Sequence, residues 1–168
     1  KVKSLRYGEN PHQSAALYKG VDFAKVPVGL VDMVQHSGED LSYSNILDAD
    51  SAFRIVNDFD ENTVTIIKHT NPCGLSNRNK QSEAYTSAYN GDPVSAYGGV
   101  VGFNRIVEKE TAVVMKGVLF DVIIAPGYED EALEILKKRK RARILSVKGF
   151  VNNKIELHSI VGGTLIQT

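Results

Sequence analysis

The sequence predicts an α/β fold in which a sheet of about five strands carries helices on its faces. Short runs rich in β-branched residues alternate along the chain with segments in which apolar residues recur every three or four positions. The 168 residues, of which 42% are hydrophobic and 24% charged, suit one soluble globular domain with its own core. Strands and helices that alternate in this way are typical of an α/β sheet.

The first part of the chain predicts an irregular lead-in followed by a helix. Residues 1–20 are rich in polar and turn-forming types, and such segments usually lie on the surface. From 45 to 59, apolar residues recur at helical spacing. This spacing predicts an amphipathic helix with Asp48 and Asp50 in its first turns, where acids suit the helix dipole.

A buried strand and a turn are predicted next. The run TVTII at 63–67 is short and dense in β-branched residues, as buried strands usually are. The run NPCG at 71–74 then predicts a turn. Lys68 and His69 are therefore expected at the carboxyl end of a strand.

The middle of the chain continues the alternation of helices and strands. A helix is predicted at about 82–89, and the run VSAYGGVVGF at 94–103 predicts a glycine-interrupted loop that leads into a strand. A helix at about 108–116 and a strand at 121–126 follow.

The carboxyl-terminal part contains the helix with the clearest signal. Acids begin the segment 128–141 and bases end it, which complements a helix dipole. The run RILSV at 143–147 and the stretch 155–167 predict further strands of the sheet.

Composition and charge limit the function classes. Lys plus Arg and Asp plus Glu number 20 each, so no overall field favours a nucleic acid or a membrane as partner. The single cysteine, Cys73, rules out an intramolecular disulfide and suits a reducing cytoplasm. No apolar run has the length of a signal peptide or a membrane span. We therefore expect a cytoplasmic protein, and the start without methionine suggests a piece of a longer one.

Lys68 and His69 are the first candidates for chemistry. They would place a cation and a titratable imidazole near the mouth of a sheet, where open α/β folds commonly bind ligands. Residue types alone favour a plainer interpretation, in which Lys68 is a solvated strand end and His69 packs on the following turn.

The segment RYGENPHQ at 6–13 is the second candidate. It contains more directional polar groups than a loop requires, and Arg6 could hold a phosphate or carboxylate through two N–H groups. By itself, the segment also fits a polar surface loop.

Five motifs in a fixed order carry a resemblance to a known family. They are RYGENPHQ (6–13), LSYSNILDAD (41–50), IIKHTNPCG (66–74), DPVSAYGG (92–99) and IAPGYEDEALEIL (124–136). In that order they resemble the successive motifs of the bacterial-type AICAR transformylase family, the folate-dependent formyltransferases of purine biosynthesis. The first and third are long and unusual strings, and the resemblance covers nearly the whole chain.

The resemblance implies a fold and a domain organisation. Members are bifunctional, with an amino-terminal inosine monophosphate cyclohydrolase followed by a transformylase built from two cytidine-deaminase-like lobes, each a three-layer sandwich. Residues 1–168 match the first lobe only. The cyclohydrolase domain and the second lobe would then lie outside this chain, and an intertwined homodimer would complete each site.

The implied reaction moves a formyl group from 10-formyltetrahydrofolate to the 5-amino group of AICAR. By resemblance His69 matches the histidine that takes the amine proton, a role that suits an imidazole. Lys68 matches the lysine that stabilises the developing oxyanion or assists proton delivery to the folate nitrogen. An alternative is a non-catalytic purine-nucleotide-binding module that retains AICAR contacts but lacks the folate-binding groups.

The resemblance also implies a set of AICAR-binding residues. The matching positions are Arg6, Tyr7, His12, Asn45, Gly98 and Asp121. Three of them have simpler possible roles: Asn45 could be a helix N-cap, Gly98 a strand-entry bend, and Asp121 the start of its strand or a turn cap.

A zinc site and a site for anions are two further kinds of site that the sequence bears on. Zinc deaminases use H-x-E and P-C-x-x-C motifs, but this chain has Pro72 and Cys73 without a second cysteine or an H-x-E, so no metal is expected. The run KKRKRAR at 137–143 could bind nucleic acid or the anionic polyglutamate tail of folate. Because the net charge is zero and no aromatics interleave the run, we expect a solvated helix end.

Overall fold

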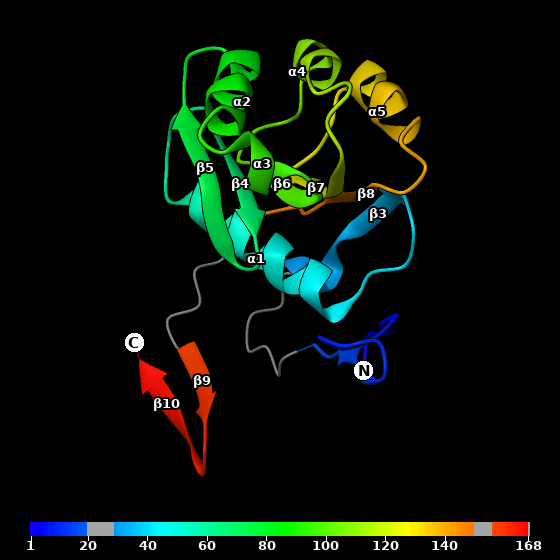
Figure 1. Cartoon of the computed structure of the whole chain (residues 1–168), viewed down its shortest axis with the longest axis vertical. Helices are drawn as coiled ribbons and strands as arrows, with labels where there is room; N and C mark the ends of the chain where they lie inside the picture. The colour runs from blue at the N-terminus through cyan, green and yellow to red at the C-terminus, as the bar shows by residue number, and fades with distance from the viewer. Residues whose placement is uncertain (20–28, 150–155, 168) are drawn as a thin grey trace.

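The computed structural model describes residues 1–19, 29–149 and 156–167, and its centre is a six-stranded mixed sheet (Figure 1). The strands are β3 (Val34–Ser37), β4 (Thr63–Lys68), β5 (Asn71–Asn77), β6 (Gly99–Phe103), β7 (Phe120–Ala125) and β8 (Arg143–Ser146). Their order is β3-β8-β7-β6-β4-β5, with β6, β7 and β8 parallel and the other pairs antiparallel. The predicted α/β class is confirmed, but the sheet has six strands rather than about five.

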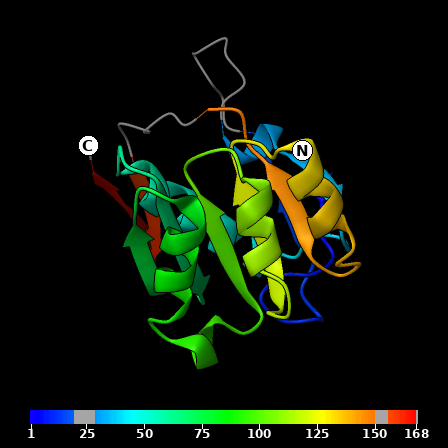
Figure 2. The same ribbon diagram turned by 90° about the horizontal axis from the view of Figure 1, so that it is seen from above.

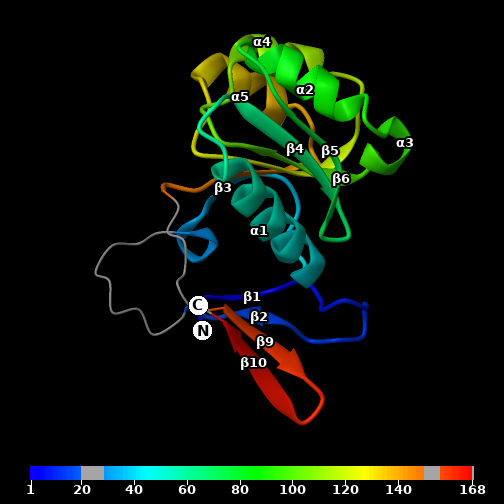
Figure 3. The same cartoon turned by 90° about the vertical axis from the view of Figure 1, so that its left-hand side faces the viewer.

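Helices cover both faces of the sheet, so the chain forms three layers (Figures 2 and 3). The helices are α1 (Tyr43–Asn57), α2 (Gln81–Tyr89), α3 (Pro93–Ala96), α4 (Lys109–Val114) and α5 (Asp130–Lys137), with a short 3-10 helix at Leu30–Asp32. Figure 3 shows α1 alone on one face and α2, α4 and α5 on the other. The parallel strands β6, β7 and β8, together with α4 and α5, therefore form the expected α/β arrangement.

The central strands are buried on both faces because neighbouring residues alternate between two cores. On β4, Ile66 packs with the cluster under α2, α4 and α5, whereas Ile67 packs with the cluster under α1. Val100 and Val101 on β6 divide in the same way. Runs of consecutive apolar residues, rather than alternating ones, are what a sheet covered on both faces requires.

Residues 71–74 are a strand rather than the predicted turn. β4 does end at Lys68, as expected, but the chain reverses within two residues, His69 and Thr70, and β5 begins at once. Asn71 already pairs with Lys68 in the antiparallel ladder. The ladder bonds of β4 override the turn preference of Asn, Pro and Gly here, since β5 is an edge strand where proline is tolerated.

The stretch 155–167 does not add strands to the main sheet. Its described part forms a separate antiparallel hairpin, β9 (Glu156–Ile160) and β10 (Gly163–Gln167), which pairs only with itself. Two strands of the main sheet are therefore unpredicted: β5, described above, and β3, whose residues VQHS lack an apolar run.

The helices differ from their predicted bounds mainly at their ends. α1 begins at Tyr43, two residues before the prediction, so Asp48 and Asp50 lie beyond its first turn. α5 ends at Lys137, four residues short of the predicted 141. The four-residue helix α3 occupies part of the segment that was predicted as a loop.

The amino-terminal segment lies beside the start of α1 (Figure 3). It is irregular apart from a two-residue ladder between β1 (Lys3–Ser4) and β2 (Ala16–Leu17), close to the prediction. Leu5 packs on the core cluster under α1, which joins the segment to the sheet unit. In the part of the chain that the structure describes, no helix is long and apolar enough to cross a bilayer.

Candidate functional site

The candidate site centres on the two-residue turn that joins β4 to β5. His69 and Thr70 have φ angles of 52° and 62°, and they are the only non-glycine residues of the described chain with positive φ. Two consecutive residues in this region are typical of the tight hairpin turn that glycine and asparagine favour. Threonine is β-branched, so its presence there is unfavourable and marks a position where the surroundings fix the backbone.

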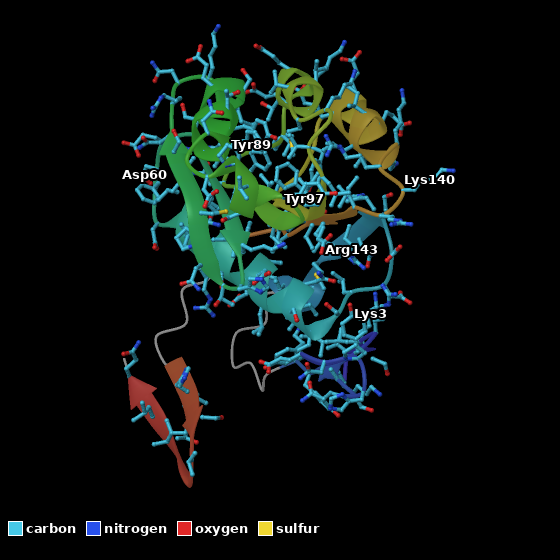
Figure 4. All side chains as sticks on the ribbon, viewed as in Figure 1. Lys3, Asp60, Tyr89, Tyr97, Lys140 and Arg143 are labelled. Atoms are coloured by element: carbon cyan, nitrogen blue, oxygen red, sulfur yellow. The ribbon has the colours of Figure 1, made fainter. Side chains whose placement is uncertain are left out.

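Lys68 points its ammonium group at the backbone before β6. Its Nζ donates to the carbonyl oxygens of Tyr97 at 3.0 Å and Gly98 at 3.1 Å. An ammonium has three N–H donors, so one remains for a ligand. Tyr97, labelled in Figure 4, is itself 65% exposed, and its backbone rather than its ring contacts the lysine.

Gly98 contributes through the absence of a side chain. Its φ is 67°, and a Cβ built there would lie 3.3 Å from the Nζ of Lys68. Its N–H donates to Leu119 at 2.9 Å, which ties the start of β6 to the start of β7. The predicted strand-entry bend is therefore present, and the same glycine also lies against the lysine.

The turn is held from the side by α1. The backbone N–H of Thr70 donates to Oδ1 of Asp48 at 2.7 Å, and the side-chain amide of Asn71 donates to the carbonyl of His69 at 2.9 Å. The sequence predicts Asp48 as a helix residue and indicates no site role for it. Helical spacing puts Asp48 on a face of α1, but it does not reveal that β4 ends opposite that face.

Asn45 lies one helical turn before Asp48 and takes part in capping the helix. The N-cap is Ser42, whose Oγ accepts from the Asn45 N–H at 3.2 Å, while Oδ1 of Asn45 accepts from the Ser42 N–H at 3.0 Å. This reciprocal pair is a capping box, so Asn45 is its third-position partner and not the N-cap. Its amide NH2 has no partner among the described residues and faces the same side as Asp48.

Arg6 and Tyr7 reach the same helix from the amino-terminal segment. The Arg6 N–H donates to the carbonyl of Leu41, and Tyr7 accepts from the N–H of Tyr43, at 2.9 and 3.0 Å. The Arg6 guanidinium lies over the Tyr7 ring, 5.5 Å from its centroid. These bonds connect the first predicted motif to the first turn of α1.

The carboxylate of Glu39 holds the Arg6 side chain. Nη1 of Arg6 lies 3.0 Å from Glu39, and the side chains are 50% and 44% exposed. Arg143, which is buried, shares the same carboxylate at 3.3 Å and donates to the carbonyl of Asp40 (Figure 4). An exposed ion pair of this kind is worth little, so an anion can compete for Arg6.

His12 and Asp121 are not brought to the Lys68 turn by any contact among the described residues. His12 lines an open hollow formed by the amino-terminal segment, together with Arg6. Asp121 is an extra residue in β7, because the register shifts between the Gly99 and Val100 pairs. Such a β-bulge can change the direction in which a side chain points. Asp121 lines a hollow together with residues of the basic segment after α5.

The basic run is only partly the solvated helix end that was predicted. Arg139 is half-buried and donates to the carbonyls of Val118 and Met115. Burial lowers the pKa of its guanidinium. Arg143 is buried, as described above, whereas Lys140 is exposed (Figure 4). The two arginines hold neighbouring backbone in place, so the run has a structural role that composition did not predict.

The described residues contain no group of three side chains placed to hold a metal ion. Cys73 is half-buried beside β4, where its thiol donates to the Ile66 carbonyl at 3.4 Å. Burial raises the pKa of this thiol, which favours its protonated form.

The edge of the sheet that carries the site differs from the expected one. β4 runs antiparallel to β6, so Lys68 at the end of β4 lies beside the beginnings of β6 and β7. The site therefore faces the amino ends of the parallel strands. Ligand sites of open parallel sheets lie at the other edge, so that general rule does not account for this one.

Comparison with known proteins shows which family the chain belongs to. Residues 1–168 match the AICARFT/IMPCHase bienzyme family. The chain is 46% identical over its whole length to the bifunctional purine biosynthesis protein of Dictyostelium discoideum, of which it covers 32%. It is 42% identical to the bifunctional purine biosynthesis protein of Caldicellulosiruptor saccharolyticus, over 99% of the chain and 33% of that protein. The chain thus spans about a third of these relatives, and it belongs to the AICARFT/IMPCHase bienzyme family.

Proposed function

We propose that this chain carries the AICAR-binding and catalytic half of a formyltransferase that moves the formyl group of 10-formyltetrahydrofolate to the 5-amino group of AICAR. One observation carries the proposal: the Lys68 ammonium is held by two carbonyls with one N–H left over, directly beside His69 on a constrained turn. Family membership supports a role in purine biosynthesis, because the relatives are named as bifunctional purine biosynthesis proteins.

We further propose that the three-layer unit is the first cytidine-deaminase-like lobe of the transformylase. The five motifs support this assignment over the cyclohydrolase part of the bienzyme. The second lobe, the cyclohydrolase domain and a second copy of the protein are then the partners that complete the site. His69 is exposed and Lys68 is half-buried, so both are accessible to such a partner.

The reaction assigns a separate task to each of the two side chains. The AICAR amine attacks the formyl carbon, a C–N bond forms, and the formyl oxygen becomes an oxyanion. His69 takes the proton that the amine loses, and the free N–H of Lys68 donates to the oxyanion. When the intermediate collapses, the bond between the formyl carbon and N10 of the folate breaks. N10 then receives the proton that His69 took from the amine, so that tetrahydrofolate leaves neutral at this atom and the imidazole returns to its starting form.

Substrate binding falls to the residues around α1. The guanidinium of Arg6 can bind the phosphate of AICAR through two N–H groups. The phosphate would then replace the carboxylate of Glu39, whose exposed pair with Arg6 is weak. The free amide NH2 of Asn45 is available for the ribose or the carboxamide. His12, Gly98 and Asp121 remain predicted binding residues, and for His12 and Asp121 a contact with AICAR requires the ligand to reach beyond the Lys68 turn.

The test is a formyl-transfer assay with 10-formyltetrahydrofolate and AICAR. The chain is measured alone and with the second lobe supplied, each as wild type, His69→Ala and His158→Ala. We expect turnover only with the second lobe, and a loss of about 10²- to 10⁴-fold in His69→Ala, the usual contribution of a positioned base. His158 is an exposed histidine of β9 and serves as the matched control.

Two outcomes would contradict parts of the proposal. Full turnover in His69→Ala would refute the assignment of the base. AICAR binding by calorimetry without any turnover, even with the second lobe, would instead favour the non-catalytic nucleotide-binding module.

A further inference from the structure

Two segments of the site that are far apart in sequence are attached to one helix. The Arg6 N–H donates to Leu41, just before α1, and Tyr43, the first residue of α1, donates to the carbonyl of Tyr7. Five residues further along, Asp48 holds the Thr70 backbone. A helix rises 1.5 Å per residue, so the two attachment points on α1 are only about 7 Å apart along its axis.

The turn that α1 holds does not adopt its conformation readily. Both His69 and Thr70 are in the left-handed region, which residues other than glycine and asparagine disfavour. Two bonds to the His69 carbonyl, from the Thr70 hydroxyl at 2.7 Å and from Asn71 at 2.9 Å, are local to the turn. Among the residues that the structure describes, the bond from Thr70 to Asp48 is the one hydrogen bond that connects the turn to another layer of the fold.

We propose that Asp48 is a positioning residue of this site. By accepting the Thr70 N–H, its carboxylate fixes the backbone of the turn and hence the direction of the His69 imidazole, relative both to Lys68 and to a substrate held at the start of α1. The inference rests on the proposed formyl transfer at Lys68 and His69. It adds that α1 acts as the spacer between the substrate-holding and the proton-accepting parts.

The neighbouring acid of the same helix shows the contrast that the test needs. Asp50 pairs with Arg54, four residues along α1, at 2.7 Å, and within the described chain it makes no hydrogen bond to the turn. The two acids have similar exposure and lie on the same helix two residues apart. Asp50→Ala therefore removes a comparable charge from α1 without removing support from His69.

The first measurement is amide hydrogen exchange at Thr70 in the full chain, for wild type, Asp48→Ala, Asp48→Asn and Asp50→Ala. A bond from an N–H to a carboxylate is among the stronger protein hydrogen bonds, so its loss should speed exchange at Thr70 about tenfold or more. Asp48→Asn keeps an oxygen acceptor of the same reach and should restore most of the protection. Unchanged exchange in Asp48→Ala would overturn the proposal.

The second measurement separates kcat from KM in the formyl-transfer assay with the second lobe supplied. Asp48→Ala should lower kcat about tenfold or more, since misplacing a reacting group by about 1 Å can cost 10²-fold, with the KM for AICAR nearly unchanged. Asp48→Asn should recover most of kcat, and Asp50→Ala should match wild type. Faster exchange at Thr70 with wild-type kcat would overturn the positioning role, as would a loss of kcat that Asp48→Asn leaves unrescued.

Thermal melting of each variant excludes a general loss of folding as the cause. A failure of the proposed function would be seen separately. Full turnover in His69→Ala would refute His69 as the base, whereas only the Asp48 variants test whether Asp48 positions the turn.

Discussion

The two sides of the sheet are built differently. The side under α2, α4 and α5 buries a large continuous cluster that includes Phe103, Met115 and Leu136, each fully buried. The side under α1 has a single helix, and its core is completed by partly buried residues of the irregular segments, such as Leu5 and Met33. The first side resembles the interior of an ordinary α/β protein, and the second is open at its margins.

The polar groups of the candidate site gather at the open side. Ser42 and Asn45 bond to each other in the capping box of α1, and Asp48 accepts from the backbone N–H of Thr70. The Lys68 turn therefore lies at the margin of the same helix. The three-helix side therefore holds most of the buried core, whereas the α1 side leaves part of its margin uncovered, where the proposed substrate-binding segments lie. Four substitutions test this division, in order of expected effect.

Removing the largest buried side chain of β6 should have the greatest effect. Phe103→Ala leaves a cavity under α2 and α4, and we expect the free energy of unfolding to fall by about 3–5 kcal/mol, measured by urea denaturation. Val94→Ala, at a residue 86% exposed, should change it by less than about 0.5 kcal/mol. AICAR affinity is then measured at temperatures where Phe103→Ala stays folded. A loss of affinity as large as that of a site substitution would contradict the separation of a stabilising side from a site-bearing side.

Replacing the site lysine should affect activity far more than stability. Lys68→Met keeps the length of the side chain and removes the donor to the oxyanion, so the barrier should rise by about 2.7–4 kcal/mol in the formyl-transfer assay. The matched control is Lys109→Met on α4, whose ammonium pairs with Glu131 at 2.9 Å in an exposed ion pair. Equal activity of the two variants would show that Lys68 is a plain strand end.

The start of α1 contributes both to stability and to the candidate site. Removing its N-cap should lower stability by an intermediate amount. Ser42→Ala removes the N-cap, and the free energy of unfolding should fall by about 1 kcal/mol, within the usual 0.5–2 kcal/mol. Ser44→Ala, in the first turn of the same helix, should be neutral or slightly stabilising, because alanine is the better helix former. A Ser42→Ala variant as stable as wild type would contradict the capping box.

The smallest expected effect is a change in stability with pH, caused by His36 on the edge strand β3. His36 bonds to the Ser146 hydroxyl at 2.8 Å, and burial, followed by the nearby charge of Lys137, lowers the pKa of its imidazole below the ordinary 6.5. The unfolded chain therefore binds the proton more readily, so stability should decrease as pH falls below 6.5 and stay level above it.

The measurement is a series of thermal melts between about pH 5 and pH 7.5. His36→Gln should flatten this slope in part, whereas His158→Gln in the exposed hairpin should leave it unchanged. A stability that rises as pH falls, and that depends on His36, would reverse the sign of the linkage.

Much of the fold followed from local patterns in the sequence. The buried strands β4 and β7 and the helices α2, α4 and α5 were predicted within a few residues, because β-branched runs and helical periodicity are strong local signals. The errors have a common cause. β3 and β5 carry polar or turn-forming residues, and the ladder bonds of their neighbours make them strands, so nothing within VQHS or NPCG could indicate it.

The residue types of the candidate site can be read from the motifs around Arg6, Asn45 and Lys68 without coordinates. The folded chain was needed to show that Lys68 contacts Gly98, that Asp48 holds the His69 turn, and that Arg139 bonds to backbone carbonyls. Sequence patterns do not reveal these contacts, because each joins residues at least 21 positions apart. Which residues meet over such separations depends on strand order and register, and these are set by the packing of the whole sheet.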